Sequence, residues 1–219
     1  MSEFHEHEHG HPHDAPGHAP PAPDEKVHSY YQLLGLAMKE LLIEKGVFDA
    51  GEIARAIEKR DAVTPALGAA AVARAWTDPQ FKERLLADGS AALRELGLDA
   101  GALRLVVKEN TPSVHNVIVC TLCSCYPRDV LGLPPSWYKS IEYRARVVRE
   151  PRAVLREFGT NLADDVAVCV HDSTADVRYL VLPMRPAGAE DLGVEELAAL
   201  VTRDCMVGVA LPAAPTRID

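Results

Sequence analysis

The chain has 219 residues, of which 47% are hydrophobic, and it carries a formal net charge of −9 and five cysteines. This length and apolar content suffice for one ordinary globular domain with appendages. No apolar run approaches the roughly 20 residues that a membrane-spanning helix needs, and the negative charge argues against nucleic acid as a partner. We expect no signal peptide, because the N-terminus is polar, and the odd number of clustered cysteines favours a reducing, cytoplasmic environment.

A histidine-rich tail occupies residues 1–26 and alternates histidine with acidic and small residues. Such a segment has too little apolar surface to fold, so we predict disorder. It serves either as a solubilising tail or, in the alternative, as a weak chelator that loads divalent metal.

A helical arm is predicted over residues 27–62. Apolar residues recur at three- and four-residue spacing over 27–46, and a second helix is predicted over 49–60. The apolar stripe of such an arm must be covered either by its own domain or by a partner subunit.

Residues 63–219 are predicted to form an α/β metal-binding catalytic domain, so the fold class is α+β. We expect helices over 64–76, 78–88, 90–96, 141–149, 151–158 and 194–201, with the break at Pro151 because proline disrupts a helix interior. Strands are predicted over 103–108, 114–119, 165–171 and 177–182. Residues 172–176 are interpreted as the turn of a hairpin, and the C-terminal tail as loose.

Three cysteines, Cys120, Cys123 and Cys125, fall within six residues directly after the second predicted strand. If Cys123 and Cys125 bind one ion, the backbone amides of Ser124 and Cys125 lie between their sulfurs. Once deprotonated, these amides complete a planar chelate that Cys120 can cap. Five strong donors with one open position suit a low-spin trivalent cobalt or iron ion better than zinc.

Spacing alone leaves other sites open, namely a zinc site, a redox site or part of an iron–sulfur site. Zinc would need a fourth ligand, for which His115 is the nearest candidate and His171, Cys169 and Cys205 are the others. If they are not ligands, we expect Cys169 and Cys205 to be buried thiols.

The run VCTLCSCYP at 119–127, followed by GLPPSWYK at 132–139 and YRARVVREPR at 143–152, resembles the α subunit of cobalt-type nitrile hydratase. It is also similar to the related metal-binding subunit of thiocyanate hydrolase. The resemblance extends over residues 73–211 and more loosely back to Tyr30. Thr121 and Tyr126 favour the cobalt type over the iron type. The resemblance implies a layered α-β-β-α domain with one Co(III) per chain.

The resemblance also implies roles for the cysteine loop. Cys120, Cys123 and Cys125 match the family's sulfur ligands, and Ser124 and Cys125 match its amide-nitrogen ligands. Cys123 then corresponds to the sulfinic acid and Cys125 to the sulfenic acid that the family forms by oxidation. The ion acts as a Lewis acid on a small nitrile, and either the Cys125 sulfenate or a water molecule attacks.

Four residues around this loop are candidates from the resemblance. Asp172, Asp176 and Arg178 fall where the family has two acids and an arginine, although a solvated charge pair in a turn would give the same pattern. Arg128 stands where many cobalt-type enzymes have tryptophan. We predict that Arg128 lies at the substrate entrance and favours an anion or a polar nitrile, the alternative being a surface arginine without substrate contact.

Partners are implied as well. In the family, one or two β-type chains supply two arginines to the oxidised cysteines, and an activator or metallochaperone is a further partner that the resemblance admits. The sequence therefore predicts the α subunit of a nitrile hydratase, with the metal subunit of a thiocyanate hydrolase as the alternative. A hypothesis of another class is a non-catalytic metal-delivery protein with exchangeable divalent metal and unoxidised cysteines.

Overall fold

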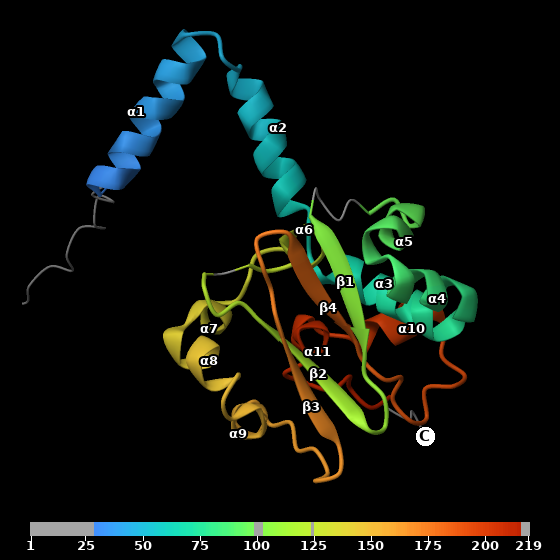
Figure 1. Ribbon diagram of the computed structural model, residues 1–219. Helices are drawn as coiled ribbons and strands as arrows, with labels where there is room; N and C mark the ends of the chain where they lie inside the picture. The colour runs from blue at the N-terminus through green and yellow to red at the C-terminus, as the bar shows by residue number, and fades with distance from the viewer. Residues whose placement is uncertain (1–28, 99–102, 124, 216–219) are drawn as a thin grey trace, which may run out of the picture. The chain divides into compact units, whose positions relative to one another are not determined.

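The computed structural model describes residues 29–98, 103–123 and 125–215. The chain divides into two compact units, Met1–Glu52 and Ile53–Asp219, whose elements are labelled in Figure 1. The boundary falls within the second helix of the segment that the sequence groups as an arm. The tail over residues 1–26 and the proposed ligand Ser124 lie outside the described residues.

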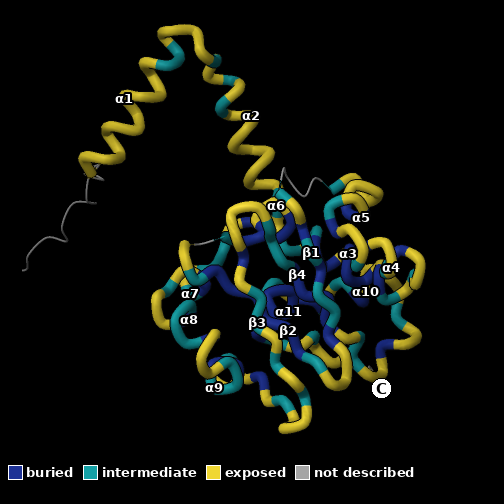
Figure 2. The backbone as a smooth tube through the Cα atoms, in the orientation of Figure 1, coloured by how far each residue is buried: buried dark blue, intermediate teal, exposed yellow. Residues whose placement is uncertain are grey.

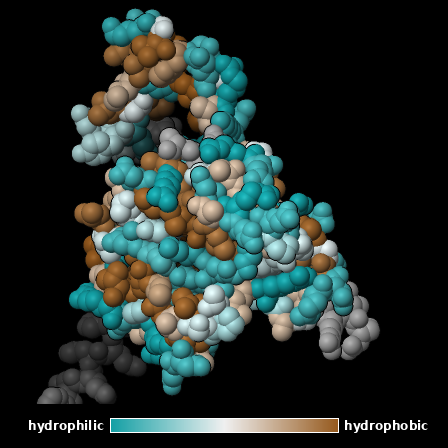
Figure 3. All heavy atoms as spheres, turned by 45° about the vertical axis from the view of Figure 1, so that its right-hand side comes forward, coloured by the Kyte–Doolittle hydropathy of each residue, from teal (hydrophilic) through white to brown (hydrophobic). Residues whose placement is uncertain are grey.

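The first unit contains helix α1 (Tyr30–Glu44), which begins at a capping box. The Ser29 Oγ accepts from the Gln32 N–H, and the Gln32 side chain accepts from the Ser29 N–H at 2.7 Å, so two unpaired donors of the first turn are satisfied. No residue of α1 is buried (Figure 2). Apolar side chains remain exposed along this segment, seen at the top of Figure 3, and include Tyr30, Tyr31, Leu33, Leu34, Leu36, Met38 and Leu41.

The sequence predicts most elements of the second unit to within a few residues. The expected helices are α2 (Ala50–Asp61), α3 (Pro65–Thr77), α4 (Pro79–Ala87), α5 (Gly89–Glu95), α8 (Ile141–Arg146), α9 (Pro151–Glu157) and α10 (Val194–Ala199). Of these, α2 crosses the boundary between the two units. The strands are β1 (Arg104–Glu109), β2 (Val114–Val119), β3 (Ala167–Asp172) and β4 (Val177–Leu182). Sequence reasoning missed the short helices α6 (Arg128–Leu131), α7 (Ser136–Lys139) and α11 (Arg203–Val207). The prediction of a loose C-terminal tail is wrong for α11, because its Cys205, Met206 and Val207 are buried.

The four strands form two parallel two-stranded sheets. Strand β1 pairs with β4, from Arg104 opposite Val177 to Glu109 opposite Leu182. Strand β2 pairs with β3, from Val114 opposite Ala167 to Val119 opposite Asp172. The predicted hairpin of β3 and β4 is therefore wrong, because each strand takes its hydrogen bonds from an earlier strand and the connection crosses between the sheets.

The two sheets lie between layers of helices. Helices α4 and α5 contact β1, α11 contacts β4, and α9 contacts β3. In Figure 1, α3, α4, α5 and α10 lie on one side of the strands and α7, α8 and α9 on the other. The α-β-β-α layering that the resemblance implies is confirmed. Strand residues fill the interior, namely Val117, Ile118, Val119, Leu180, Val181 and Leu182, each at most 1% exposed.

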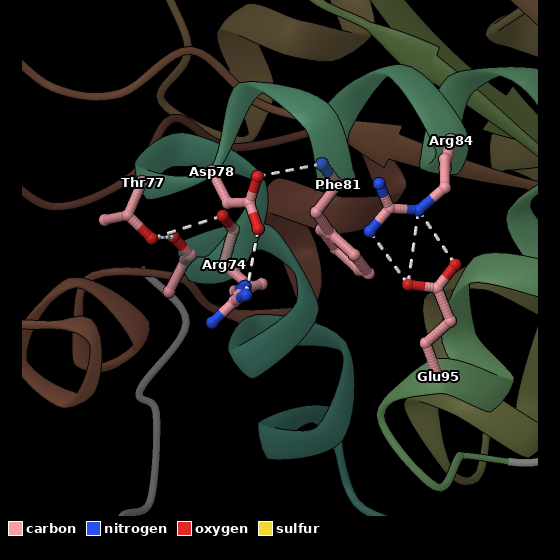
Figure 4. A network of polar contacts seen from close by, with 7 residues as sticks. Arg74, Thr77, Asp78, Phe81, Arg84 and Glu95 are labelled. Carbon is pink, nitrogen blue, oxygen red and sulfur yellow. Dashed lines mark hydrogen bonds and ion pairs between the residues drawn. The ribbon is translucent and has the colours of Figure 1, made fainter.

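Acidic residues fix the junctions between α3, α4 and α5 (Figure 4). Asp78 caps α4 by accepting from the Phe81 N–H at 3.0 Å, and it pairs with Arg74 at the end of α3 at 2.8 Å. Arg84 of α4 forms a two-pronged ion pair with Glu95 of α5. These contacts set the angles between consecutive helices on one side of the sheets.

A buried polar network joins β2 to the end of α11. The His115 Nε2–H donates to the Gly208 carbonyl at 2.7 Å, and the Asn110 amide lies 3.3 Å from His115 Nδ1. Asn110 Oδ1 accepts from the backbone N–H of Asn116 at 2.7 Å. All three side chains are at most 4% exposed. Because buried polar groups are costly when unpaired, these bonds fix the position of β2 strictly.

Among the described helices, none has the length and apolar character needed to cross a bilayer.

Candidate metal centre

The three clustered cysteines lie together where β2 ends. The chain leaves the strand at Val119 and reaches Cys120 at once; Cys120 is buried, Cys123 is exposed and Cys125 is half-buried. The Sγ atoms of Cys120 and Cys123 are 3.5 Å apart, and those of Cys123 and Cys125 are 3.2 Å apart. All three sulfurs lie within 4.8 Å of one another, so they can contact one ion.

The sulfur spacing allows all three sulfurs to bind one metal ion. With metal–sulfur bonds of about 2.3 Å, two sulfurs on one ion lie about 3.3 Å apart at 90° and about 3.8 Å apart at the tetrahedral angle. The observed 3.2 Å is close to the first value, and the observed 3.5 Å lies between the two. Burial and the neighbouring sulfurs of Cys123 and Cys120 raise the pKa of the Cys125 thiol to about 12, opposed by Arg178. A cation bound to the sulfur would therefore favour ionisation of the Cys125 thiol.

The structure does not support a tetrahedral zinc site with the ligands that sequence reasoning offered. Within residues 29–98, 103–123 and 125–215, no histidine, aspartate, glutamate or further cysteine joins the three sulfurs within 4.8 Å. His115 is held by Gly208, and His171 Nε2 lies 2.8 Å from Asn116 Oδ1. Cys205 is buried, as expected, but Cys169 is exposed on β3, so the prediction of a buried thiol is wrong there.

Asp172 anchors the cysteine loop. The parallel register places Asp172 beside Val119 at the end of the β2–β3 pair. Val119 lies two residues before Thr121, so the Asp172 carboxylate is within reach of Thr121. One carboxylate oxygen accepts from the Thr121 N–H at 2.9 Å, and the other accepts from the Thr121 hydroxyl at 2.5 Å. Because hydrogen bonds to an ionised group are the stronger ones, this pair holds the loop at its start.

A cavity of about 250 Å³ opens beside the sulfurs of Cys123 and Cys125. Arg128 and Arg178 both line it, together with apolar side chains that include Leu103 and Leu105. Arg178 is held in place because its guanidinium donates to the carbonyls of Thr174 and Val177 at 2.5 and 3.1 Å. The lining of the cavity therefore carries two cations and one acidic residue, Asp129, next to the cysteines.

Of the sequence-predicted neighbours, only Asp176 lies apart. Its backbone carbonyl accepts from the Arg104 N–H at 3.1 Å, and its exposed side chain is not among those that line the cavity. Asp176 thus lies in the connection between the two sheets, while Asp172 binds the cysteine loop and Arg178 lines the cavity.

Sequence reasoning missed two side chains that bind the backbone of the loop and a third that binds the strand before it. Tyr138 donates to the Cys125 carbonyl at 2.9 Å, and Arg144 donates to the Thr121 carbonyl at 3.1 Å. Tyr143 donates to the carbonyl of Ile118, within β2, at 2.7 Å. The residues lie in stretches that the sequence marks only by resemblance, and no spacing rule connects a tyrosine hydroxyl to a distant carbonyl.

The chain is similar to known proteins over most of its length. The family described as nitrile hydratase, alpha chain, matches residues 29–210. The low-molecular-weight cobalt-containing nitrile hydratase subunit alpha of Rhodococcus rhodochrous is 52% identical over 83% of this chain and 88% of its own. The cobalt-containing nitrile hydratase subunit alpha of Pseudonocardia thermophila is 49% identical over 85% and 93%.

A solved structure has a similar fold over most of the chain. A recombinant thiocyanate hydrolase with partially modified cobalt centres superposes with a TM-score of 0.80 at 40% identity, over 85% of this chain and 91% of that one. The match of family, sequence and fold over most of the chain shows that the protein belongs to the nitrile hydratase α-chain family.

Proposed function

We propose that this chain is the metal-binding α subunit of a cobalt-dependent nitrile hydratase, which adds water to a nitrile and forms the amide. The observation that carries the proposal is the group of three cysteine sulfurs, 3.2 and 3.5 Å apart, at the edge of a 250 Å³ cavity. The relatives that are 52% and 49% identical are both named as cobalt-containing α subunits, which supports cobalt over iron.

Cys120, Cys123 and Cys125 would hold the ion through sulfur, and the backbone amides of Ser124 and Cys125 would complete the ligand set. Bound Co(III) would supply Lewis acidity that makes a nitrile carbon electrophilic. Water adds its oxygen to that carbon and a proton to nitrogen; the resulting imidic acid then moves its hydroxyl proton to nitrogen and becomes the amide. No net oxidation or reduction occurs, so no organic cofactor is required.

The residues of this chain orient the reaction. Oxidation of Cys123 to the sulfinate and of Cys125 to the sulfenate by an external oxidant, such as dioxygen or a peroxide, would place negative oxygens in the cavity. There a water molecule would attack the carbon directly, or the Cys125 oxygen would attack it and a water molecule would then replace the oxygen transferred to the product. Such oxygens need cationic hydrogen-bond partners, and Arg178 is a fixed cation that lines the same cavity. Asp172 keeps the loop in place through Thr121.

A β-type partner subunit completes the site in this proposal. Leu122, in the middle of the cysteine loop, is 88% exposed, and the apolar residues of α1 are exposed as well. A partner that covers these surfaces also brings arginines to the oxidised cysteines. We place the assembled enzyme in the cytoplasm, where the free cysteines remain reduced until the metal is loaded, with an activator or metallochaperone as the source of the ion.

One observation favours a second candidate function. Arg128 lines the cavity beside the sulfurs, and a cation there favours an anionic substrate such as thiocyanate over an apolar nitrile. A thiocyanate hydrolase is also among the proteins with this fold.

The test is coexpression of the chain with its partner subunit and cobalt, followed by assays of amide formation from nitriles and of thiocyanate hydrolysis. Nitrile turnover that exceeds thiocyanate turnover supports the proposal, and the reverse supports the second candidate. Absence of both activities, with exchangeable divalent metal and unoxidised cysteines, would support metal delivery instead.

A further inference from the structure

One short segment, residues 137–144, supplies three donors to the backbone around the cysteine loop. Tyr143 reaches the Ile118 carbonyl before the loop, Arg144 reaches the Thr121 carbonyl within it, and Tyr138 reaches the Cys125 carbonyl at its end. Arg144 and Tyr138 therefore hold the loop itself, whereas Tyr143 holds the strand that precedes it. Only Tyr138 contacts a residue whose own sulfur belongs to the cluster.

The hydroxyl of Tyr138 is held rigidly. Tyr138 is fully buried, with 0% exposure. Its ring lies edge to face on Tyr126 at 4.9 Å between centroids, and it also contacts the rings of Trp137 and Tyr143. Trp137 in turn packs against Phe158 at 4.7 Å. Aromatic contacts of this kind fix the ring plane, so the hydroxyl cannot follow the loop if the loop moves.

The carbonyl that Tyr138 binds belongs to the last cysteine of the cluster. The 2.9 Å bond fixes the peptide plane that follows Cys125, and the Arg128 N–H binds the next carbonyl, of Tyr126, at 2.8 Å. Because this peptide plane includes the Cα of Cys125, the bond restricts the positions that the Cys125 side chain can reach. Its sulfur lies 3.2 Å from that of Cys123, on the wall of the cavity.

We propose that Tyr138 is a positioning residue for the metal centre: its hydroxyl, through the Cys125 carbonyl, holds the backbone of Cys125 where the sulfur can reach the ion and the cavity. This inference rests on the proposed function, because it assumes that the cysteine sulfurs bind cobalt. Partners of metal ligands typically alter metal affinity or activity by about 10- to 100-fold when they are removed.

The chain offers a matched control. Tyr138→Phe and Tyr143→Phe each remove one buried hydroxyl that donates to a backbone carbonyl, and both rings belong to the same aromatic group. The two variants should therefore lose similar thermal stability. Tyr143 binds the carbonyl of a strand residue that is not a proposed ligand, so only the first variant should disturb the centre.

The experiment compares wild type, Tyr138→Phe and Tyr143→Phe, each purified with the partner subunit and cobalt. The readouts are cobalt retained after dialysis against a chelator, the sulfur-to-cobalt charge-transfer absorption, and kcat and KM for a nitrile. We expect Tyr138→Phe to shift the absorption band and to lower kcat by about tenfold with a KM close to that of wild type. Tyr143→Phe should retain the wild-type band and kcat.

A Tyr138→Phe variant with the same band and kcat as Tyr143→Phe overturns the inference while leaving the proposed function intact. Wild-type protein without cobalt overturns the proposed function and the inference together. If Tyr138→Phe does not accumulate, 3-fluorotyrosine at position 138 keeps the ring and makes the hydroxyl a stronger donor. The band should then shift in the absorption spectrum of the folded complex, and an unshifted band overturns the inference.

Discussion

Replacing Gly208 by alanine tests how closely the end of α11 approaches the strand that carries the metal loop. Gly208 has a φ of +91° and its N–H bonds to the carbonyls of Asp204 and Cys205. A methyl group on Gly208 would lie 2.0 Å from the Asn116 carbonyl oxygen and 3.0 Å from the Val117 Cα. Both contacts are backbone atoms of β2, so neither can rotate away.

Two costs add for this variant. Left-handed backbone costs alanine about 1–2 kcal/mol relative to glycine. Forcing a methyl into a filled interior costs about 1–3 kcal/mol more. We therefore expect Gly208→Ala to lower the free energy of unfolding by about 2–5 kcal/mol.

Gly159→Ala is the matched control, because Gly159 has a φ of +84° and nothing lies within 4 Å of the added methyl. It should lose only the conformational cost, about 1–2 kcal/mol. Urea unfolding of the full-length chain, followed by circular dichroism, measures both variants. Equal losses in the two would refute the close approach of α11 to β2.

Three further predictions concern the loop, the buried histidine and the entrance. Asp172→Ala should release cobalt to a chelator about tenfold faster than wild type, because the Thr121 N–H and hydroxyl lose their acceptors. Asp172→Asn can still form a hydrogen bond with each group, so it should release cobalt at a rate much closer to wild type. Equal release rates for the two variants would contradict this. Burial lowers the pKa of His115, so the folded state favours the neutral ring; its contribution to stability is full above pH ~6.5 and is lost as the pH falls below that value. In urea titrations, His115→Gln should be less stable than wild type at pH 7 but should lose less stability than wild type between pH 6.5 and 5. Parallel stability curves for the two proteins would refute this. Arg128→Met should raise kcat/KM for an apolar nitrile relative to an anionic substrate, and an unchanged ratio would show that Arg128 does not contact substrate.

The sequence predicts elements well where local chemistry decides them. Pro151 begins α9 as expected, although the preceding helix α8 already ends at Arg146, and the strand predicted over 114–119 appears as β2. Strand pairing was not predictable in the same way. The four residues between β3 and β4 have the composition of a hairpin turn. Pairing is decided instead by which apolar faces meet in the core, and both strands are parallel to earlier ones.

The candidate site follows the same division. Cys120, Cys123 and Cys125 come together because they are near neighbours in sequence. Asp172 reaches Thr121 across 51 positions because of the parallel register, and only the resemblance indicated it. The bond of Tyr138 could not be predicted, because it joins a side chain to a backbone carbonyl and every residue has a carbonyl. Helix α11 is too short to show a period, and tertiary packing stabilises it.

Metal analysis and peptide mass measured on the chain purified with its partner subunit test the central claim most directly. The account predicts cobalt near one per chain and an added mass of roughly three oxygen atoms on the peptide that contains Cys123 and Cys125, two for a sulfinic and one for a sulfenic acid. Zinc in place of cobalt, with no added oxygen and no nitrile turnover after cobalt and oxidant are supplied, would contradict it.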